Sequence, residues 1–118
     1  SRIREMLNYT VRENNGVKII DLSGTLTAQD EETFKSLVQR ITEKESVIIN
    51  LENITLVSSS GLSSLVDVSF FAKEHGTRVI YVWPSDDLIR LAEDMDVYAF
   101  LLFAGSIEEG QTKIKYFT

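Results

Sequence analysis

The sequence predicts a single α/β domain built on a mixed, mostly parallel β-sheet. Short strand-like segments, rich in β-branched residues, alternate with segments whose apolar residues recur every three or four positions. The tight-turn sequence Asn14-Asn15-Gly16 joins the first two strand-like segments, whereas a helix separates each later pair. The order β-β-α-β-α-β-α-β-α therefore predicts an N-terminal β-hairpin followed by βα units, with right-handed crossovers between parallel strands.

Length and composition limit the kinds of protein this is. A chain of 118 residues suits one compact domain, which we assign to residues 1–118. It has no cysteine, which excludes disulfides, thiolate nucleophiles and cysteine metal ligands. Its 18 acidic and 12 basic residues give a net charge of −6, which disfavours nucleic acid and anionic membrane surfaces as partners. No apolar run approaches the ~20 residues that span a bilayer. Ser1–Glu5 has no signal-peptide character, so we expect a cytoplasmic protein without membrane insertion.

The N-terminal half is expected to form the hairpin and the first crossover. Residues 7–11 alternate apolar with polar side chains, as a half-exposed strand does, and residues 17–22 return as its partner. Thr27 and Asp30 have the spacing of a capping box and predict the start of a helix. The apolar stripe of that helix consists of Phe34, Leu37, Val38 and Ile41.

The next crossover is expected to be the most buried. Residues 47–51 are almost continuously apolar, which predicts a central strand that is covered on both faces and ends in a polar turn. A helix should run from about Ser60 to His75, with Gly76 as its C-terminal cap, and its apolar positions go most of the way round. Residues 79–83 are another apolar, β-branched segment and predict the next buried strand.

The C-terminal third repeats the pattern with shorter elements. Ser85 is placed to cap a third helix. Residues 99–103 predict the last strand, and Ser106 opens a short terminal helix.

Three consecutive serines, Ser58, Ser59 and Ser60, precede the apolar helix at the end of the central strand. The N-terminus of a helix offers unpaired N–H groups and the positive end of the helix dipole, so a serine here is well placed to carry or recognise a phosphate. Serine is also a favoured helix cap, but all three cannot cap one helix. Gly61 in the first turn would let the backbone of another molecule approach closely.

The patterns expected of an enzyme are missing from the sequence. His75 is the only histidine, and a solvated position near a helix end explains it. No nucleophile elbow or glycine-rich nucleotide loop occurs. The acidic residues 30–32 and 86–87 lie in first helical turns, where they complement the helix dipole. We therefore expect no catalytic residue, no metal and no cofactor.

Two segments resemble the motifs of a known family. Residues 20–27, IDLSGTLT, are similar to the second strand and L-x-G-x-L-D turn of the STAS domain (sulfate transporter and anti-sigma factor antagonist). Residues 51–62, LENITLVSSSGL, are similar to that family's L-x-x-[VI]-x-[FY]-[MI]-D-S-[ST]-G-L segment. The resemblance covers almost the whole chain and is strongest to the stand-alone bacterial anti-sigma factor antagonists. It implies a STAS-like domain whose helices pack mainly on one face of the sheet.

The resemblance implies a phosphorylation switch in transcription regulation. A dephosphorylated member binds an anti-sigma factor that is also a serine kinase of the GHKL type, and this binding releases a sigma factor. The kinase phosphorylates the antagonist, and a serine phosphatase reverses this. Carried onto this chain, the phosphorylated residue is Ser59, with Ser58 and Ser60 as alternatives. Ser58 stands where the motif has aspartate, Thr25 and Thr27 stand where the turn has its usual acids, and Asp30 is a candidate replacement for them.

The same resemblance implies a partner-binding surface made of the 24–28 loop, the 58–62 turn and the exposed side of the following helix. The residues expected there are Gly24, Thr25, Thr27, Ser58, Ser60, Gly61, Ser63, Ser64 and Asp67. Two other functions stay open. One is a STAS adaptor that is never phosphorylated and binds an ABC-transporter ATPase or a signalling scaffold. The other is a sensor that binds a small anion at the helix N-terminus.

Overall fold

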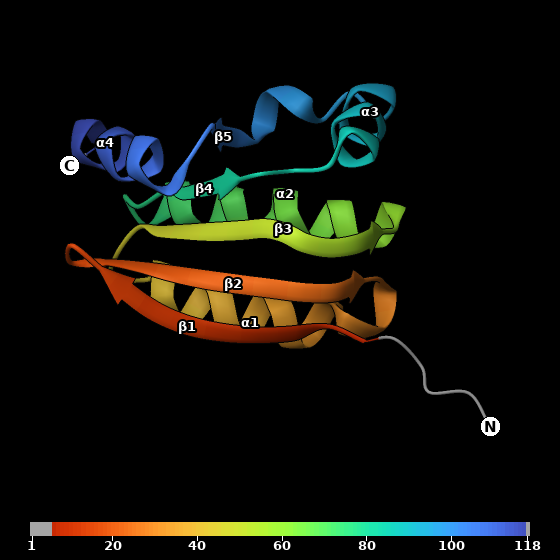
Figure 1. The fold of residues 1–118 in the computed structure, drawn as a ribbon, viewed down its shortest axis with the longest axis horizontal. Helices are drawn as coiled ribbons and strands as arrows, with labels where there is room; N and C mark the ends of the chain where they lie inside the picture. The colour runs from red at the N-terminus through yellow and green to blue at the C-terminus, as the bar shows by residue number, and fades with distance from the viewer. Residues whose placement is uncertain (1–5, 118) are drawn as a thin grey trace.

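The computed structural model describes residues 6–117, which form a five-stranded sheet with helices packed against it (Figure 1). The strands are β1 (Asn8–Asn14), β2 (Val17–Leu26), β3 (Val47–Val57), β4 (Val79–Val82) and β5 (Leu102–Ala104). The helices are α1 (Glu31–Thr42), α2 (Ser59–Glu74), α3 (Asp86–Asp94) and α4 (Ile107–Phe117), and the 3-10 turns are η1 (Ala28–Asp30) and η2 (Tyr98–Phe100). The prediction about Ser1–Glu5 lies outside the described residues.

The sheet has the order β1-β2-β3-β4-β5, and only the β1–β2 pair is antiparallel. This arrangement confirms the predicted mixed, mostly parallel sheet. The hairpin turn is confirmed as well, because Asn15 and Gly16 both have positive φ angles, 52° and 79°. Across residues 6–117, no helix combines the length and apolar character needed to cross a bilayer.

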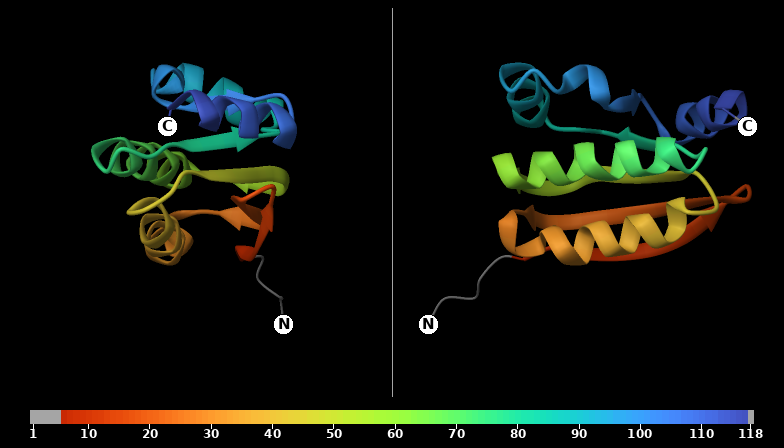
Figure 2. Two further views of the ribbon diagram at one scale, coloured as in Figure 1. Left: turned by 90° about the vertical axis from the view of Figure 1, so that its left-hand side faces the viewer. Right: turned by 180° about the vertical axis from the view of Figure 1, so that it is seen from behind.

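The two faces of the sheet carry separate cores, because successive strand residues point to opposite sides. Ile20, Ile49 and Tyr81 pack with buried residues of α1, α2 and α3, whereas Ile19 and Ile48 belong to a smaller cluster with α4. In the two opposite views of Figures 1 and 2, α1 and α2 lie together on one side of the strands. The expectation that helices cover mainly one face is therefore confirmed.

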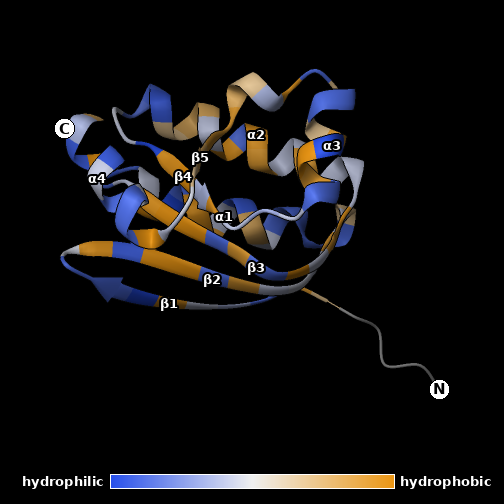
Figure 3. Cartoon of the chain, turned by 45° about the horizontal axis from the view of Figure 1, so that its top comes forward, coloured by the Kyte–Doolittle hydropathy of each residue, from blue (hydrophilic) through white to orange (hydrophobic). Residues whose placement is uncertain are grey.

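The edge strand β1 is more exposed than its alternating pattern predicts. All seven of its residues are exposed, including Tyr9 and Val11. Figure 3 shows β1 as mostly hydrophilic beside the hydrophobic bands of β2 and β3. The larger core does reach the start of this strand through Leu7, which packs against it.

Several strand boundaries differ from the sequence prediction. The second strand, expected over residues 17–22, continues to Leu26. The expected end of the central strand near residue 51, followed by a polar turn, is wrong, because β3 continues to Val57. Its second half pairs with the end of β2, up to Leu26 opposite Val57, and this long-range pairing overrides the polar character of the segment. The last strand begins at Leu102, not at residue 99, because residues 98–100 form η2.

The predicted helix caps are confirmed. The Thr27 N–H donates to the Asp30 carboxylate at 3.0 Å, although one turn of 3-10 helix precedes α1. The Ser85 and Ser106 hydroxyls accept hydrogen bonds from the first turns of α3 and α4. Gly76 follows α2 with a φ of +77°, the conformation that commonly ends a helix.

Candidate functional site

The two sequence motifs meet at one edge of the sheet. Strands β2 and β3 are parallel, and both extend beyond β4, whose pairing with β3 ends at Asn50 opposite Val82. The loop after Leu26 and the turn after Val57 consequently lie side by side at the ends of the two strands (Figure 1). The fold thus places residues 24–28 beside the N-terminus of α2.

Ser58 is the serine that caps α2. Its hydroxyl accepts a hydrogen bond from the Gly61 N–H at 3.0 Å, and its carbonyl accepts from the Leu62 N–H at 2.8 Å. Its own N–H donates to the Leu26 carbonyl at 3.0 Å, which ties the helix start to the end of β2. Aspartate is an equally good cap, so Ser58 retains the capping ability of the motif's aspartate and loses only its charge.

Ser59 and Ser60 are exposed in the first turn of α2. Within residues 6–117, neither side chain makes a hydrogen bond, since the cap is supplied by Ser58. The first turn of α2 carries no acidic residue, so the positive end of its dipole is not compensated by a neighbouring side chain. An added anionic group on either serine is favoured there by the helix itself.

Gly61 has a role inside the protein that sequence analysis assigned to another molecule. The backbone that approaches Gly61 is that of Leu26 in the same chain: a Cβ at Gly61 would lie 2.9 Å from the Leu26 carbonyl carbon and closer still to its oxygen. Gly61 is also buried. Glycine therefore lets α2 begin directly against the end of β2.

The end of β2, which includes Gly24 and Thr25 although both were expected in a loop, and the loop after it are also held by contacts within the chain. Gly24 has a φ of +87°, and a Cβ there would collide with the Met6 carbonyl. The Asp30 carboxylate accepts hydrogen bonds from the Leu7 N–H and from both the N–H and the hydroxyl of Thr27. Asp30 is thus occupied in holding this loop rather than directed toward Ser59. Thr25 is only 6% exposed. It is therefore buried beneath the exposed residues of the expected partner-binding surface and supports them.

One side of α2 continues the exposed surface. Ser63 and Asp67 follow Ser59 at intervals of four residues and are exposed, which places them on one face of the helix. The Lys35 ammonium lies 3.4 Å from the Asp67 carboxylate. The expectation for Ser64 is wrong: it is fully buried, and its hydroxyl donates to the Ser60 carbonyl at 3.2 Å, because it lies on the side of α2 that faces the core.

One apolar residue at this edge was not predicted from the sequence. Leu56 lies two positions before the capping serine and is 56% exposed. The neighbouring Thr55 hydroxyl donates to the Gly24 carbonyl at 3.1 Å, so the segment is fixed while the leucine side chain faces solvent. In the sequence, the sign of this exposed leucine was an apolar residue within a segment that was predicted to be a polar turn.

Near the middle of β2, Asp21 forms the ion pair with the shortest distance among residues 6–117. The Arg12 guanidinium donates to its carboxylate at 2.6 Å, and the Asn50 amide donates at 2.8 Å. These contacts, chiefly the one with Arg12, hold the pKa of Asp21 below its usual value. No group of three histidine or acidic side chains in the described part of the chain is arranged to hold a metal ion.

A family model of the STAS domain matches residues 8–110. The chain belongs to the STAS domain family. A sequence comparison with curated proteins finds no match. The family model covers both motifs and all five strands, so the resemblance proposed from residues 20–27 and 51–62 is confirmed.

Solved structures share the fold of this STAS domain. The unphosphorylated anti-sigma factor antagonist SpoIIAA aligns with a TM-score of 0.70 and 16% identity, over 92% of this chain and 97% of that chain. Phosphorylated SpoIIAA from Bacillus has a TM-score of 0.67 at 16% identity, over 89% and 98%. Protein TM1081 from Thermotoga maritima has a TM-score of 0.77 at 16% identity, over 98% and 93%. The TM-scores establish a shared fold, and at this level of identity they establish the fold alone.

Proposed function

We propose that this STAS domain is an anti-sigma factor antagonist that acts by binding rather than by catalysis. The unphosphorylated protein binds an anti-sigma factor that is also a GHKL-type serine kinase, and this binding releases a sigma factor in the cytoplasm. The kinase phosphorylates Ser59, and the complex then dissociates. A serine phosphatase removes the phosphate, so that the complex can form again. Family membership supports this proposal, as does the likeness to two structures described as those of an antagonist in unphosphorylated and phosphorylated forms.

The position of Ser59 is the observation that carries the proposal. Its side chain is exposed on the first residue of α2, and the neighbouring Ser58 supplies the cap. Modification of Ser59 therefore removes no hydrogen bond that the fold uses. Ser58 is the weaker candidate, because its hydroxyl already accepts the Gly61 N–H and the residue is less exposed than Ser59.

The physical basis of the switch is local charge. A phosphate brings ~1.5–2 negative charges and three acceptor oxygens. The helix N-terminus tolerates that charge, so the free protein keeps its fold. In a complex, the phosphate would have to give up its hydration. It would also contact a partner surface that fits the neutral serine, and both effects oppose binding. The chain already has a net charge of −6, so its surface adds to the repulsion between the phosphate and an acidic partner.

The decisive experiment uses tagged protein to capture its partner from a lysate of the source organism. ATP is then added, and mass spectrometry maps phosphate within residues 58–60. With the purified partner, calorimetry should show that Ser59→Asp weakens binding about tenfold or more, which is at least ~1.4 kcal/mol. Ser59→Ala should bind but resist phosphorylation.

Ser36→Asp is the matched control, because Ser36 is an exposed serine on α1 outside the proposed surface. It makes the same charge change and should leave the affinity unchanged. Equal binding by Ser59→Asp and the unmodified protein would contradict the proposed switch.

A second function is favoured by the missing acids. No acidic residue lies in the first turn of α2, and Ser58 replaces the aspartate that precedes the acceptor in the motif. An adaptor that is never phosphorylated needs no such charge. It would form a stable complex with an ABC-transporter ATPase or a signalling scaffold. Ser59→Asp would leave that complex intact, and all three serines would stay unmodified after ATP is added.

A further inference from the structure

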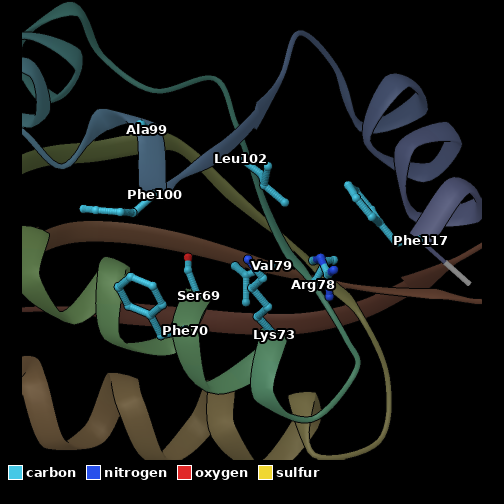
Figure 4. Close-up of a pocket in the computed structure, with 9 residues that line it drawn as sticks. All are labelled: Ser69, Phe70, Lys73, Arg78, Val79, Ala99, Phe100, Leu102 and Phe117. Carbon is cyan, nitrogen blue, oxygen red and sulfur yellow. The ribbon is translucent and has the colours of Figure 1, made fainter.

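A hollow of about 260 Å³ lies beside the C-terminal half of α2, where η2, β5 and the end of α4 meet (Figure 4). Lys73, one of its lining residues, is 14 positions beyond Ser59 on the same helix, which corresponds to about 20 Å along the axis. The hollow is therefore separate from the Ser59 surface, and an inference about it does not depend on the proposed function.

Aromatic rings form the sides of this hollow. Phe70, Phe100 and Phe117 are 46%, 50% and 41% exposed, although each contributes a large apolar surface. The Phe70 and Phe100 rings lie 5.3 Å apart between centroids. In Figure 4, Phe100 and Phe117 stand on opposite sides, with Lys73 and Arg78 between them. The free energy falls when an apolar group enters between such rings and displaces water from them.

Two cations lie in the same hollow without an acidic partner. Among residues 6–117, neither Lys73 nor Arg78 takes part in an ion pair, and no aspartate or glutamate lines the hollow. The Arg78 guanidinium lies 4.8 Å from the centre of the Phe117 ring and donates one hydrogen bond to the Thr77 carbonyl at 2.8 Å. Its remaining N–H groups can pair with a carboxylate, which is the anion that guanidinium geometry fits.

We propose that this hollow binds a small carboxylic acid whose body is a single apolar ring. The carboxylate lies between Lys73 and Arg78, and the ring lies between the phenylalanine side chains. The volume fits this class, because an engineered cavity of about 150 Å³ holds benzene. It falls below the ~300–1,000 Å³ typical of pockets for drug-sized ligands, which disfavours nucleotides.

The test is an NMR titration of ¹⁵N-labelled protein with phenylacetate. Saturable shifts are expected around residues 69–79 and 99–103 and at Phe117, with a Kd of about 5 mM or below. Phenylacetamide has the ring without the charge, and acetate has the charge without a ring. Each should bind about fivefold more weakly or worse, because each lacks one of the two contacts.

Variants assign the binding to the two cations. Lys73→Gln and Arg78→Gln should each weaken phenylacetate binding about fivefold, with the amide spectrum reporting that the fold is kept. Lys44→Gln makes the same charge change at an exposed lysine outside the hollow and should leave the affinity unchanged. Shifts that do not saturate, equal binding of phenylacetamide, or shifts centred on Ser59 would each overturn the proposal. Ser59→Asp should bind phenylacetate normally, so this test and that of the proposed function fail independently.

Discussion

Replacing Gly61 with alanine should destabilise the protein, even though alanine is the better helix former. The added Cβ would lie 2.9 Å from the Leu26 carbonyl carbon and 3.1 Å from Cγ1 of Val57, whereas unstrained carbon contacts lie near ~3.5–4.0 Å. Leu26 cannot turn away, because its backbone pairs with Val57 in the sheet and its carbonyl accepts the Ser58 N–H. The start of α2 must therefore move.

The magnitude follows from three contributions. Overpacking of this kind costs about 1–3 kcal/mol. Moving α2 away from β2 also weakens the hydrogen bond from the Ser58 N–H to the Leu26 carbonyl, at about 0.5–1.5 kcal/mol. Alanine returns at most about 1 kcal/mol through its helix propensity. With the full gain from helix propensity, the free energy of unfolding should therefore fall by roughly 0.5–3.5 kcal/mol for Gly61→Ala.

Equilibrium urea unfolding followed by far-ultraviolet circular dichroism measures this change. The midpoint should fall while the slope of the transition stays constant, which identifies a loss of native stability. Ser60→Ala is the matched control: Ser60 is the preceding residue in the same turn, is exposed, and should change stability by less than about 0.5 kcal/mol. If Gly61→Ala were as stable as the unmodified protein, Leu26 would not hold α2 closely and the account of this glycine would be wrong.

Three further predictions test the cap, the core and the ion pair. Ser58→Ala should cost about 1 kcal/mol in urea melts, whereas Ser58→Gly should cost only a few tenths; equal losses would argue against capping. Leu65→Ala should cost about 2–5 kcal/mol, because Leu65 is fully buried, and a loss under about 0.5 kcal/mol would contradict that placement. The pKa of Asp21 is lowered in the folded state, so its contribution is present above the unfolded pKa of about 3.9 and disappears as pH falls through the folded pKa. Urea melts between about pH 7 and 3 should therefore show a shallower loss of stability for Asp21→Asn, and an unchanged acid limb would contradict this.

The predictions that held depend on short stretches of chain. The Asn15-Gly16 turn, the Thr27 cap and the Ser85 cap each follow from residues within about four positions of one another. Several of the predictions that failed, among them the ends of β2 and β3 and the start of β5, concern limits that depend on pairing with distant strands. Residues 52–57 are polar enough to read as a turn, and only their partners on β2 keep them extended.

At the candidate site, the sequence indicated the serine cluster but not the role of each member. The pattern at residues 58–61 predicted a capped helix start, because a serine just before an apolar helix can accept a hydrogen bond from an N-terminal N–H group in any fold. Which serine caps became clear only in the structure, where the Ser58 hydroxyl accepts the Gly61 N–H and the Ser58 N–H bonds to Leu26 of a neighbouring strand. The burial of Ser64 was equally undetermined, because α2 is apolar on most of its circumference and its sequence alone does not fix which side faces the core.

The sequence by itself determined the order of the elements, the presence of capped helix starts and the family, because these depend on local chemistry and on motifs that are continuous in the chain. Only the tertiary structure decided that Gly61 meets the backbone of Leu26, and that Lys73 and Arg78 share a hollow with Phe100 and Phe117. The physical reason is that contacts between distant segments depend on how the strands register and how closely each helix approaches the sheet. Those quantities arise from the packing of the whole core and cannot be read from any one segment.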